Sequence, residues 1–458
     1  MQSNTDTVIL GAGISGLCVA HVLNKEHKSL LVLESSNQVG GAIQSSQADG
    51  YLAEHGPNSI LVKDKRVATL LDDVGLNVTE TLPAREEAKK RYIVHNGEPH
   101  AMPAGPFGML KTPLFSFGGK LRFALEPFTG RYQGREKGLG EESFADFVRR
   151  RLGPDMLASA AGPFVSGIYA GDPEKLSVRH AFPRLWNLEE RYRSFILGAL
   201  ALQFGGGNNP HRLAPSQMLS FNSGMHAMPK AIADHLSDDI LKLDCKIDDI
   251  QKTDTGWRVC WSNSNGQHET ECRNLVSTAP HHRLGEIPLP DSVSKDLAPV
   301  VSLDSPPVTS LVLGFRREDI THPLDGFGML IKQSENSPLL GVLFSSSMFD
   351  GRAPEGHVTL TCMMGGTIHP EFAENSDETV LAELKRLLGV DGKPTFRHKT
   401  SWSKAIPQYG LGYQSVLDAL ENVEKEHSGL HFAGNYRGGI SVGDCIVNGL
   451  ELGKRIST

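Results

Sequence analysis

Three glycines near the N-terminus have the spacing that a backbone needs to hold a pyrophosphate. They lie in the sequence GAGISG, after an apolar strand predicted over residues 8–10 and before a helix predicted over 15–24. Gly11 would permit a tight turn, Gly13 would let a phosphate approach the backbone, and Gly16 would let the helix pack closely on the strand. This spacing predicts a dinucleotide site at a helix N-terminus. The alternative is a glycine-rich turn that binds nothing.

An acidic residue and a second glycine pair follow the turn. Glu34 ends another apolar strand, predicted over 30–33, and lies 18 residues after Gly16. An acid at this distance would accept hydrogen bonds from an adenosine ribose. Gly40 and Gly41 come next, where an extended flavin, unlike NAD, needs a second close approach to the backbone. An ordinary Gly-Gly turn is the alternative.

The C-terminus carries a second glycine-rich segment. A strand is predicted over 430–433, a glycine-rich loop over 434–443 and a helix over 444–456, with Asp444 as the helix N-cap. Such a segment, far from the first, could hold the other end of one long cofactor. A helix N-terminus aimed at a flavin would stabilise the negative charge of its reduced form. The two ends together favour FAD over NAD, although an ordinary strand-to-helix connection would look similar.

The composition is that of a globular protein with more than one domain. The 458 residues, 39% hydrophobic and 22% charged, predict about two or three domains. A net charge of -7 and a pI of about 6.2 argue against a general nucleic-acid binder. Six scattered cysteines without a C-x-x-C pair favour a reduced compartment and predict neither a metal site nor disulfides. The first residues lead directly into a strand, so a cytoplasmic protein is expected.

Residues 85–135 carry basic and aromatic side chains close together. The segment has nine Lys and Arg against four Glu, a balance of +5 in a chain of -7, and phenylalanines are spaced among them. Basic charge beside exposed aromatic side chains attracts an anionic lipid surface. No run of the sequence approaches the roughly 18 apolar residues of a spanning helix, so such a contact would be peripheral. The alternative is a helical subdomain with a solvated basic face.

The pattern of elements predicts an α/β protein. We expect a Rossmann-like FAD-binding domain, a substrate domain on a mostly antiparallel sheet, and an inserted helical domain that is a candidate membrane-facing domain. The expected limits are 1–84, 216–280 and 405–458 for the first, 85–95 and 281–404 for the second, and 96–215 for the third.

The individual predictions within these domains are as follows. Helices are predicted over 67–74, 141–152, 156–164, 189–204 and 377–388, and a polar linker over 205–215. Strands are predicted over 241–250, 257–261, 269–277, 310–315, 328–331, 339–345 and 358–364.

Several longer motifs are distributed along nearly the whole chain. They are GPNS at 56–59, SGIYAGDPEKLSV at 166–178, WNLEE at 186–190, AIPQY at 405–409 and GNYRGGISVGDC at 434–445. With these motifs the chain resembles the FAD-dependent protoporphyrinogen oxidases, within the amine-oxidase-like flavoproteins. The motif SGIYAGDPEKLS is the most specific part of the resemblance.

The resemblance implies which residues would hold the cofactor. It assigns the adenosine diphosphate half to Gly11, Ala12, Gly13, Ile14, Ser15, Gly16, Glu34 and Ser35. Gly40, Gly41 and Ala42 would follow the cofactor, and Ile247 would meet the adenine through its backbone. The flavin end would be surrounded by Gly56, Pro57, Asn58, Ser59, Trp402, Gly434, Asn435, Ile440, Ser441 and Val442. Ala42 departs from the Arg that relatives among the amine oxidases have there, which puts a phosphate contact in doubt.

The resemblance also implies a substrate site. Arg91 would bind a propionate, Gly167 would make a close backbone contact, and the apolar walls around the macrocycle would be Leu330, Leu343 and Met363. Met363 stands where an aromatic residue is common, which puts ring stacking in doubt but not an apolar wall. Asn58 is a candidate orienting residue, with capping of its own loop as the alternative. No side chain has a clear claim as general base.

The implied activity is the six-electron oxidation of protoporphyrinogen IX to protoporphyrin IX in heme biosynthesis, with molecular oxygen reduced to hydrogen peroxide in three flavin cycles. One alternative is coproporphyrinogen III oxidation, for which Lys89, Lys90 and Arg122 are candidate extra cations. Another amine or carotenoid oxidoreductase and a flavin-binding module without turnover are further alternatives. A monomer or homodimer, a membrane surface and a ferrochelatase are the candidate partners beyond the substrate, and no nucleic acid is expected.

Overall fold

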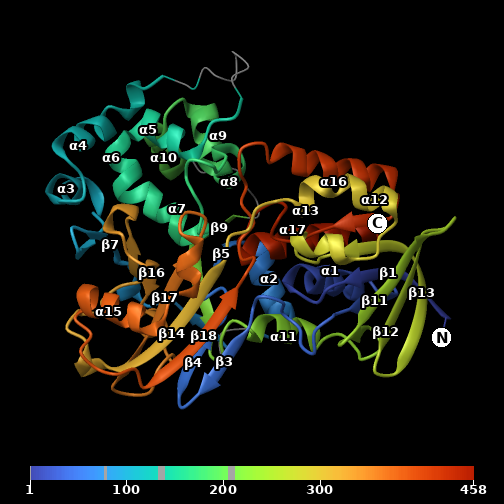
Figure 1. Cartoon of the computed structure of the whole chain (residues 1–458). Helices are drawn as coiled ribbons and strands as arrows, with labels where there is room; N and C mark the ends of the chain where they lie inside the picture. The colour runs from blue at the N-terminus through green and yellow to red at the C-terminus, as the bar shows by residue number, and fades with distance from the viewer. Residues whose placement is uncertain (1, 77–79, 131, 133–139, 205–211) are drawn as a thin grey trace.

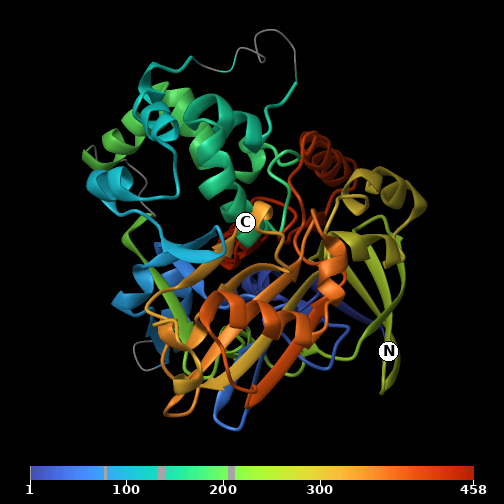
Figure 2. The same cartoon turned by 60° about the vertical axis from the view of Figure 1, so that its left-hand side comes forward.

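The computed structural model describes residues 2–76, 80–130, 132, 140–204 and 212–458. Two seven-stranded sheets lie beside each other, and a group of helices lies above the second sheet (Figures 1 and 2). Seven strands form the first sheet: β1 (Gln2–Leu10), β2 (Leu30–Leu33), β10 (Leu241–Lys242), β11 (Lys246–Lys252), β12 (Trp257–Asn263), β13 (Gly266–Ser277) and β19 (Leu430–Phe432).

The first sheet is a doubly wound α/β core. The strands β10, β2, β1, β13 and β19 are parallel, and β12 and β11 extend the sheet as antiparallel strands. Val8 and Leu10 of β1 face one hydrophobic cluster, and Ile9 faces another, because alternate side chains of a strand point to opposite faces. The covering helices are α1 (Ile14–Lys25), α2 (Lys65–Asp73), α11 (Ala227–Ala233) and α17 (Val442–Ser457) on the Ile9 face, with α12 (Asp291–Asp296), α13 (Ala298–Val301) and α16 (Gln414–Glu426) on the other. The prediction of an α/β fold is confirmed.

The second sheet is mostly antiparallel, as predicted. Its order is β18-β14-β17-β16-β15-β7-β8, with β15 and β7 as the parallel pair. The strands are β7 (Arg91–His95), β8 (Glu98–Ala101), β14 (Val308–Arg316), β15 (Gly328–Ile331), β16 (Leu339–Leu343), β17 (His357–Gly365) and β18 (Phe396–Trp402). Helix α15 (Asp377–Leu388) has the predicted limits and covers one face through Val380, Leu384 and Leu387.

Small sheets and turns connect these units. They comprise β3 (Ser45–Ala48) with β4 (Tyr51–Glu54), and β5 (Ile60–Asp64) and β6 (Thr81–Pro83) with β9 (Arg212–Phe221). The shorter helices are η1 (Glu86–Lys89), η4 (His281–Glu286), η5 (Arg317–Asp319), η6 (Gln333–Glu335), α14 (Ser345–Met348) and η7 (Pro370–Glu374). Strand β9 begins inside the predicted linker 205–215, whose residues 205–211 lie outside the described ones. The predicted domain limits at 95 and 215 therefore fall inside the β7–β8 hairpin and inside β9.

The middle third is helical, but its helices do not all have the predicted limits. They are α3 (Gly105–Lys111), α4 (Phe117–Ala124), η2 (Glu126–Phe128), α5 (Phe144–Leu152), α6 (Pro154–Met156), η3 (Leu157–Ala161), α7 (Gly162–Tyr169), α8 (Val178–Ala181), α9 (Pro183–Tyr192) and α10 (Phe195–Phe204). The single helix predicted over 189–204 is wrong, because Arg193 adopts a left-handed conformation with φ of 58°. The carboxylate of Glu126 then caps a new helix by accepting hydrogen bonds from the N–H groups of Phe195 (2.9 Å) and Ile196 (3.1 Å).

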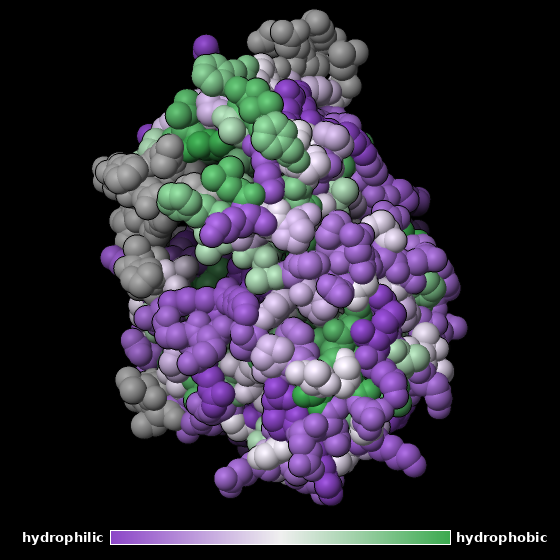
Figure 3. Space-filling model, turned by 90° about the vertical axis from the view of Figure 1, so that its left-hand side faces the viewer, coloured by the Kyte–Doolittle hydropathy of each residue, from purple (hydrophilic) through white to green (hydrophobic). Residues whose placement is uncertain are grey.

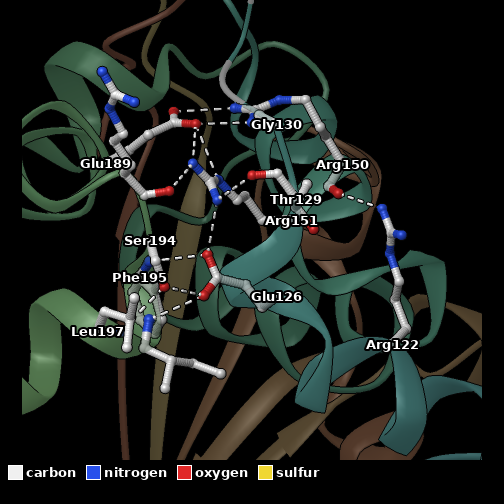
Figure 4. A network of polar contacts seen from close by, with 12 residues as sticks. Arg122, Glu126, Thr129, Gly130, Arg150, Arg151, Glu189, Ser194, Phe195 and Leu197 are labelled. Atoms are coloured by element: carbon white, nitrogen blue, oxygen red, sulfur yellow. Dashed lines mark hydrogen bonds and ion pairs between the residues drawn. The ribbon is translucent and has the colours of Figure 1, made fainter.

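A buried network of charges joins these helices (Figure 4). The guanidinium of Arg151, fully buried, donates to Glu126 Oε1 (3.0 Å), to Glu189 Oε1 (2.5 Å) and to the Arg193 carbonyl (2.9 Å). Arg150 donates to Glu189 and, from the other side, to Glu142. Burial alone would raise the pKa of Glu189, but hydrogen bonds and positive charge from Arg150 and Arg151 outweigh it and lower the pKa. The network thus fixes α5, η2, α9 and α10 against one another.

Apolar side chains are exposed over the same helices. Phe107, Phe117 and Phe128 are 82%, 83% and 85% exposed, and Leu110, Leu121 and Leu125 accompany them. We call these six residues the apolar patch. Hydrophobic side chains gather in the upper part of the face shown in Figure 3, which turns the α3–α4 side of Figure 1 toward the viewer. Among the described residues, no helix combines the length and apolarity needed to cross a bilayer.

Candidate cofactor and substrate site

The first glycine turn forms an open cradle at the start of α1. Gly11 has a φ of 105°, which favours glycine. A Cβ atom on Gly16 would lie 2.1 Å from the Gly11 carbonyl oxygen, whereas a Cβ on Gly13 would meet nothing within 4 Å. Gly13 is the N-cap of α1 and supplies no side-chain cap, so the N–H groups of the first turn remain for an anion. The space beside Gly13 therefore fits a phosphate.

The second glycine pair lies directly beside the first turn. The Gly40 N–H donates to the Ala12 carbonyl at 2.8 Å, and Gly40 and Gly41 have φ of 105° and 58°. A Cβ on Gly41 would lie 3.5 Å from the Gly13 Cα. The two glycine turns thus lie against each other, which suits a cofactor lying extended across both.

The Glu34 carboxylate connects the first glycine turn with the segment that follows β2. Its Oε2 accepts a hydrogen bond from the Ala12 N–H at 2.6 Å, and its Oε1 accepts from the Ser36 N–H at 2.9 Å. The Glu34 carbonyl accepts from the Cys245 N–H at 2.8 Å, which brings β11 and Ile247 to the same end of the sheet. The predicted contacts of Glu34, Ser35 and Ile247 with an adenosine stay predictions.

The C-terminal loop is fixed by Tyr409, which belongs to the AIPQY motif but whose contacts the sequence did not predict. The Tyr409 hydroxyl donates to the Asn435 carbonyl at 2.7 Å and accepts from the Gly439 N–H at 3.1 Å. Ser441, not Asp444, is the N-cap of α17: its hydroxyl accepts from the Asp444 N–H at 3.2 Å. The N-cap prediction was wrong because Asp444 already lies in the first turn of the helix.

Helices α17 and α1 pack closely and hold the two glycine loops at a fixed separation. A Cβ on Gly449 would lie 2.7 Å from the Ser15 carbonyl oxygen, and one on Gly453 would lie 2.8 Å from the Val22 Cβ. Both glycines lie on one face of α17, four residues apart. This spacing was visible in the sequence and was missed.

The loop 56–59 meets the second sheet at its β18 edge. A Cβ on Gly56 would lie 2.4 Å from the Ala42 carbonyl oxygen, and the Trp402 indole donates to the His55 carbonyl at 2.9 Å. The Asn58 side-chain amide donates to the Gly56 carbonyl at 3.1 Å, so Asn58 caps its own turn. The structure thus brings the segments of Ala42, Asn58 and Trp402 together, as the resemblance implied, while their contacts with a flavin stay predictions.

The predicted substrate residues share one face of the second sheet. The strand register places Arg91 opposite Gly328, which lies opposite Leu343. In the next row Leu330 lies opposite Gly341, which lies opposite Met363. Residues that face one another across a sheet, and those two apart on a strand, point to the same side.

Gly167 of α7 meets this face from the helical region. A Cβ on Gly167 would lie 2.3 Å from a Leu330 methyl carbon, so the position admits no side chain. The opposite face of the sheet carries the cluster that packs on α15. Five residues from distant parts of the chain therefore lie on or against one surface, although their contacts with a substrate stay predictions.

The Arg91 side chain differs from those of Lys89, Lys90 and Arg122 in having no hydrogen-bond or ion-pair partner among the described residues. Its exposed guanidinium lies over the Phe327 ring, 5.3 Å from the centroid. Lys89 pairs with Glu86, Lys90 pairs with Asp325 at 2.6 Å, and Arg122 donates to the Arg150 carbonyl at 2.6 Å. Arg91 is therefore the cation of this group that is ready to bind an incoming carboxylate.

Comparisons with known proteins agree with this geometry. The family described as flavin containing amine oxidoreductase matches residues 14–456. The mitochondrial protoporphyrinogen oxidase of Nicotiana tabacum is 33% identical, over 96% of this chain and 92% of its own length. The coproporphyrinogen III oxidase of Bacillus subtilis (strain 168) is 28% identical over 96% of each.

Solved structures show the same fold at lower identity. A crystal structure from Exiguobacterium sp. 255-15, provisionally named a protoporphyrinogen oxidase, has a TM-score of 0.81 at 20% identity and covers 100% of this chain and 99% of its own. Reduced UDP-galactopyranose mutase has a TM-score of 0.74 at 15% identity, with 99% of each chain covered.

The fold and the two glycine-lined ends define an FAD-dependent oxidoreductase. The chain belongs to the protoporphyrinogen oxidase family, within the flavin containing amine oxidoreductases. The open space beside Gly13, next to the Gly40-Gly41 turn, fits the cofactor that this family uses.

Proposed function

We propose that this protein oxidises protoporphyrinogen IX to protoporphyrin IX in heme biosynthesis, with molecular oxygen as the electron acceptor. The single observation that carries the proposal is the surface that combines Arg91, which has no ion-pair partner among the described residues, with the apolar side chains of Leu330, Leu343 and Met363. A porphyrinogen is an apolar macrocycle with carboxylate arms, so it requires this combination. The relatives named protoporphyrinogen oxidase, at 33% identity, support the same substrate.

The residues of the chain would orient and shield, while bound FAD supplies the two-electron oxidation. The guanidinium of Arg91 would hold a propionate by charge-assisted hydrogen bonds. Leu330 and Met363 would pack on the macrocycle and exclude water, and Gly167 lets α7 pack directly on Leu330, which would hold that wall in place. Complete oxidation removes six hydrogens in three rounds, and three molecules of oxygen become hydrogen peroxide.

The paired cations favour protoporphyrinogen over coproporphyrinogen. Coproporphyrinogen III has four propionates instead of two and would need more free cations at the site. Lys89, Lys90 and Arg122, which could have served, are already engaged by protein groups. The second candidate function, coproporphyrinogen III oxidation, rests on the Bacillus subtilis relative at 28% identity.

Replacement of Arg91 by Ala tests the proposal. We expect KM for protoporphyrinogen IX to rise by about 10- to 100-fold with little change in kcat, because one charge-assisted contact is lost from bound substrate and transition state alike. Lys89→Ala is the matched control, since Lys89 is exposed and paired with Glu86, and its KM should stay unchanged. An unchanged KM for Arg91→Ala would remove the assigned role.

The proposal includes peripheral contact with a membrane through the apolar patch. The three phenylalanines of the patch are more than four-fifths exposed, and the exposed Lys111 ends α3 beside them. An apolar surface flanked by basic charge suits an anionic lipid surface. A cytoplasmic location, a monomer or homodimer and delivery of the product to a ferrochelatase complete the proposal.

Vesicle binding tests this part separately. The wild type should sediment with vesicles that contain anionic lipid, and the triple variant Phe107→Ser, Phe117→Ser, Phe128→Ser should remain in the supernatant. Leu411→Ser is the control, because Leu411 is half exposed and lies outside the patch. Equal sedimentation of the wild type and the triple variant would exclude the patch as a membrane contact.

A further inference from the structure

The buried carboxyl group of Glu54 lies between the cofactor loop and the proposed substrate face. Glu54 ends β4 and is 4% exposed. Its carboxylate accepts hydrogen bonds from the Ser45 hydroxyl (2.5 Å) and the Met225 N–H (2.9 Å). These contacts position the carboxyl group but leave it without an ion pair within 4.0 Å among the described residues. A buried carboxyl group of this kind is unusual and calls for a function.

Glu54 lines a small cavity, walled by both polar and apolar side chains, that reaches the cofactor loop. The cavity has about 10 Å³ open to a water-sized sphere, and its polar lining comprises Glu54, Asn58, Ser345, Arg352 and Thr361. This is room for about one water molecule with several hydrogen-bonding partners. Asn58 belongs to the GPNS loop, so the cavity connects Glu54 with the segment that the resemblance assigns to the flavin end.

The cavity also adjoins the proposed substrate face. Thr361 lies directly opposite Leu343 in the pairing of β17 with β16, and therefore points to the same side of the sheet. Ser345 follows Leu343 by two residues and its hydroxyl lies 2.8 Å from that of Thr361. A proton that left a substrate lying on Leu343 would thus have a polar route between the strands to Glu54.

We propose that Glu54 accepts protons during the oxidation, through a water molecule that this cavity holds between Glu54 and Asn58. This inference rests on the proposed function. Each round takes one hydride and one proton from the macrocycle, and oxygen receives both as hydrogen peroxide. The proton leaves a pyrrole N–H, passes through the water and forms an O–H bond on a Glu54 carboxyl oxygen, which releases it again when the peroxide forms.

The surroundings of Glu54 suit this task near neutral pH. Burial raises its pKa to about 7, against the hydrogen bonds from Ser45 and Met225 and the attraction of Arg352. Arg352 itself is buried and donates to the Ser220 hydroxyl (2.7 Å) and to the Phe221 carbonyl (3.1 Å). The other titratable groups near Glu54 are imidazoles: His226 after the Met225 contact, and His55, which stacks on His398 at 4.4 Å. Burial lowers the pKa of His55 and of His398, so both are neutral at this pH.

Glu54→Gln tests the inference, because the glutamine carbonyl oxygen can accept from the Met225 N–H and its NH2 group can donate to the Ser45 hydroxyl, but glutamine cannot take up the proton. Glu383→Gln is the matched control: Glu383 is also buried, but lies on α15 at the other face of the sheet and pairs with Arg386. The first measurement is infrared titration of the FAD-loaded proteins, which detects carboxylic acid without turnover. A band that titrates near pH 7 should be present in the wild type and Glu383→Gln and absent from Glu54→Gln.

The second measurement is the pH profile of kcat with protoporphyrinogen IX. In the wild type kcat should rise with pH through about 7, and in Glu54→Gln it should be flat and about 100-fold lower on the plateau. Asn58→Ala should lower kcat while it retains the infrared band, which tests the route independently if Glu54→Gln fails to fold. A wild-type pH profile in Glu54→Gln, or a wild-type kcat in Asn58→Ala, would overturn the inference alone. A wild type that oxidises neither porphyrinogen would overturn the proposed function and this inference with it.

Discussion

The cofactor region and the helical region are both tightly held, but by opposite means. Around the cofactor groove, glycines let backbones approach where a single Cβ atom would collide, as at Gly16 and Gly449. In the helical region, long charged side chains cross between helices, as Arg151 does from α5 to α9 and η2 (Figure 4). The first arrangement leaves a groove open for a ligand, whereas the second fills its space with hydrogen bonds. The difference suggests that the helical region is built to present a fixed surface.

The difference also decides what a sequence reveals. Close backbone packing requires glycine at defined spacings, so GAGISG and Gly40-Gly41 predict their own surroundings. Glu126 gives no such signal, because an acid in a basic run reads as a solvated charge. In the structure it is fully buried and caps α10. The break between α9 and α10 could therefore not be predicted from the helical period alone.

Removal of the central arginine of the network should have the largest effect on stability. Arg151→Met leaves the buried Glu126 without its cation, so we expect the free energy of unfolding to fall by about 3–5 kcal/mol. Arg149→Ala, which removes an arginine that is 40% exposed and paired at the surface, should change stability by less than about 1 kcal/mol. Chemical denaturation measures both. Equal, small changes would show that the network contributes little to the helical region.

The two buried glutamates should respond to pH in opposite directions. The pKa of Glu54 in the folded protein is raised to about 7. Its contribution to the free energy of unfolding is therefore complete below about pH 4, and about 3 kcal/mol of stability is lost as pH rises through 7. Because the folded pKa of Glu189 is lowered, its contribution is present above the unfolded value and is lost on acidification. Unfolding free energies of Glu54→Gln and wild type, measured from pH 5 to 8, should therefore diverge with rising pH in favour of the variant. Parallel curves would contradict the assigned pKa.

Two glycines of the first turn, Gly13 and Gly16, should separate folding from cofactor binding. Gly16→Ala places a Cβ against the Gly11 carbonyl, and we expect a loss of about 2 kcal/mol in stability together with the bound FAD. Gly13→Ala meets open space at an extended φ of -69°. It should leave the stability of the apoprotein within about 0.5 kcal/mol and weaken FAD binding. Normal FAD affinity in Gly13→Ala would show that no phosphate lies there.

The smallest effect is expected at the N-cap of α17. Ser441→Ala removes the hydroxyl that accepts from the Asp444 N–H and should reduce stability by about 1 kcal/mol. Asp444→Asn keeps the Ser441 hydroxyl and its hydrogen bond from the backbone N–H of residue 444, and serves as the control. Thermal unfolding compares the two, and a larger loss in Asp444→Asn would return the cap to Asp444.

The sequence predicted the fold better than the details of the site. The parallel core and the antiparallel second sheet followed from apolar strands and glycine turns, and α15 followed from its apolar face. The common face of Arg91, Leu330, Leu343 and Met363 depends on strand register, which no local pattern specifies. Tyr409 was missed for the same reason, since its partners Asn435 and Gly439 are distant in sequence.

An aerobic assay with both porphyrinogens shows which substrate the protein oxidises. The purified protein with bound FAD is mixed aerobically with protoporphyrinogen IX and, in parallel, with coproporphyrinogen III, while porphyrin fluorescence and hydrogen peroxide are followed. We expect a higher kcat/KM for protoporphyrinogen IX, with three molecules of hydrogen peroxide per porphyrin. Among the described residues, Arg91 has no ion-pair partner, whereas Lys89, Lys90 and Arg122 are engaged by other protein groups. Preference for coproporphyrinogen III, or no oxidation of either compound by the FAD-loaded protein, would contradict the account.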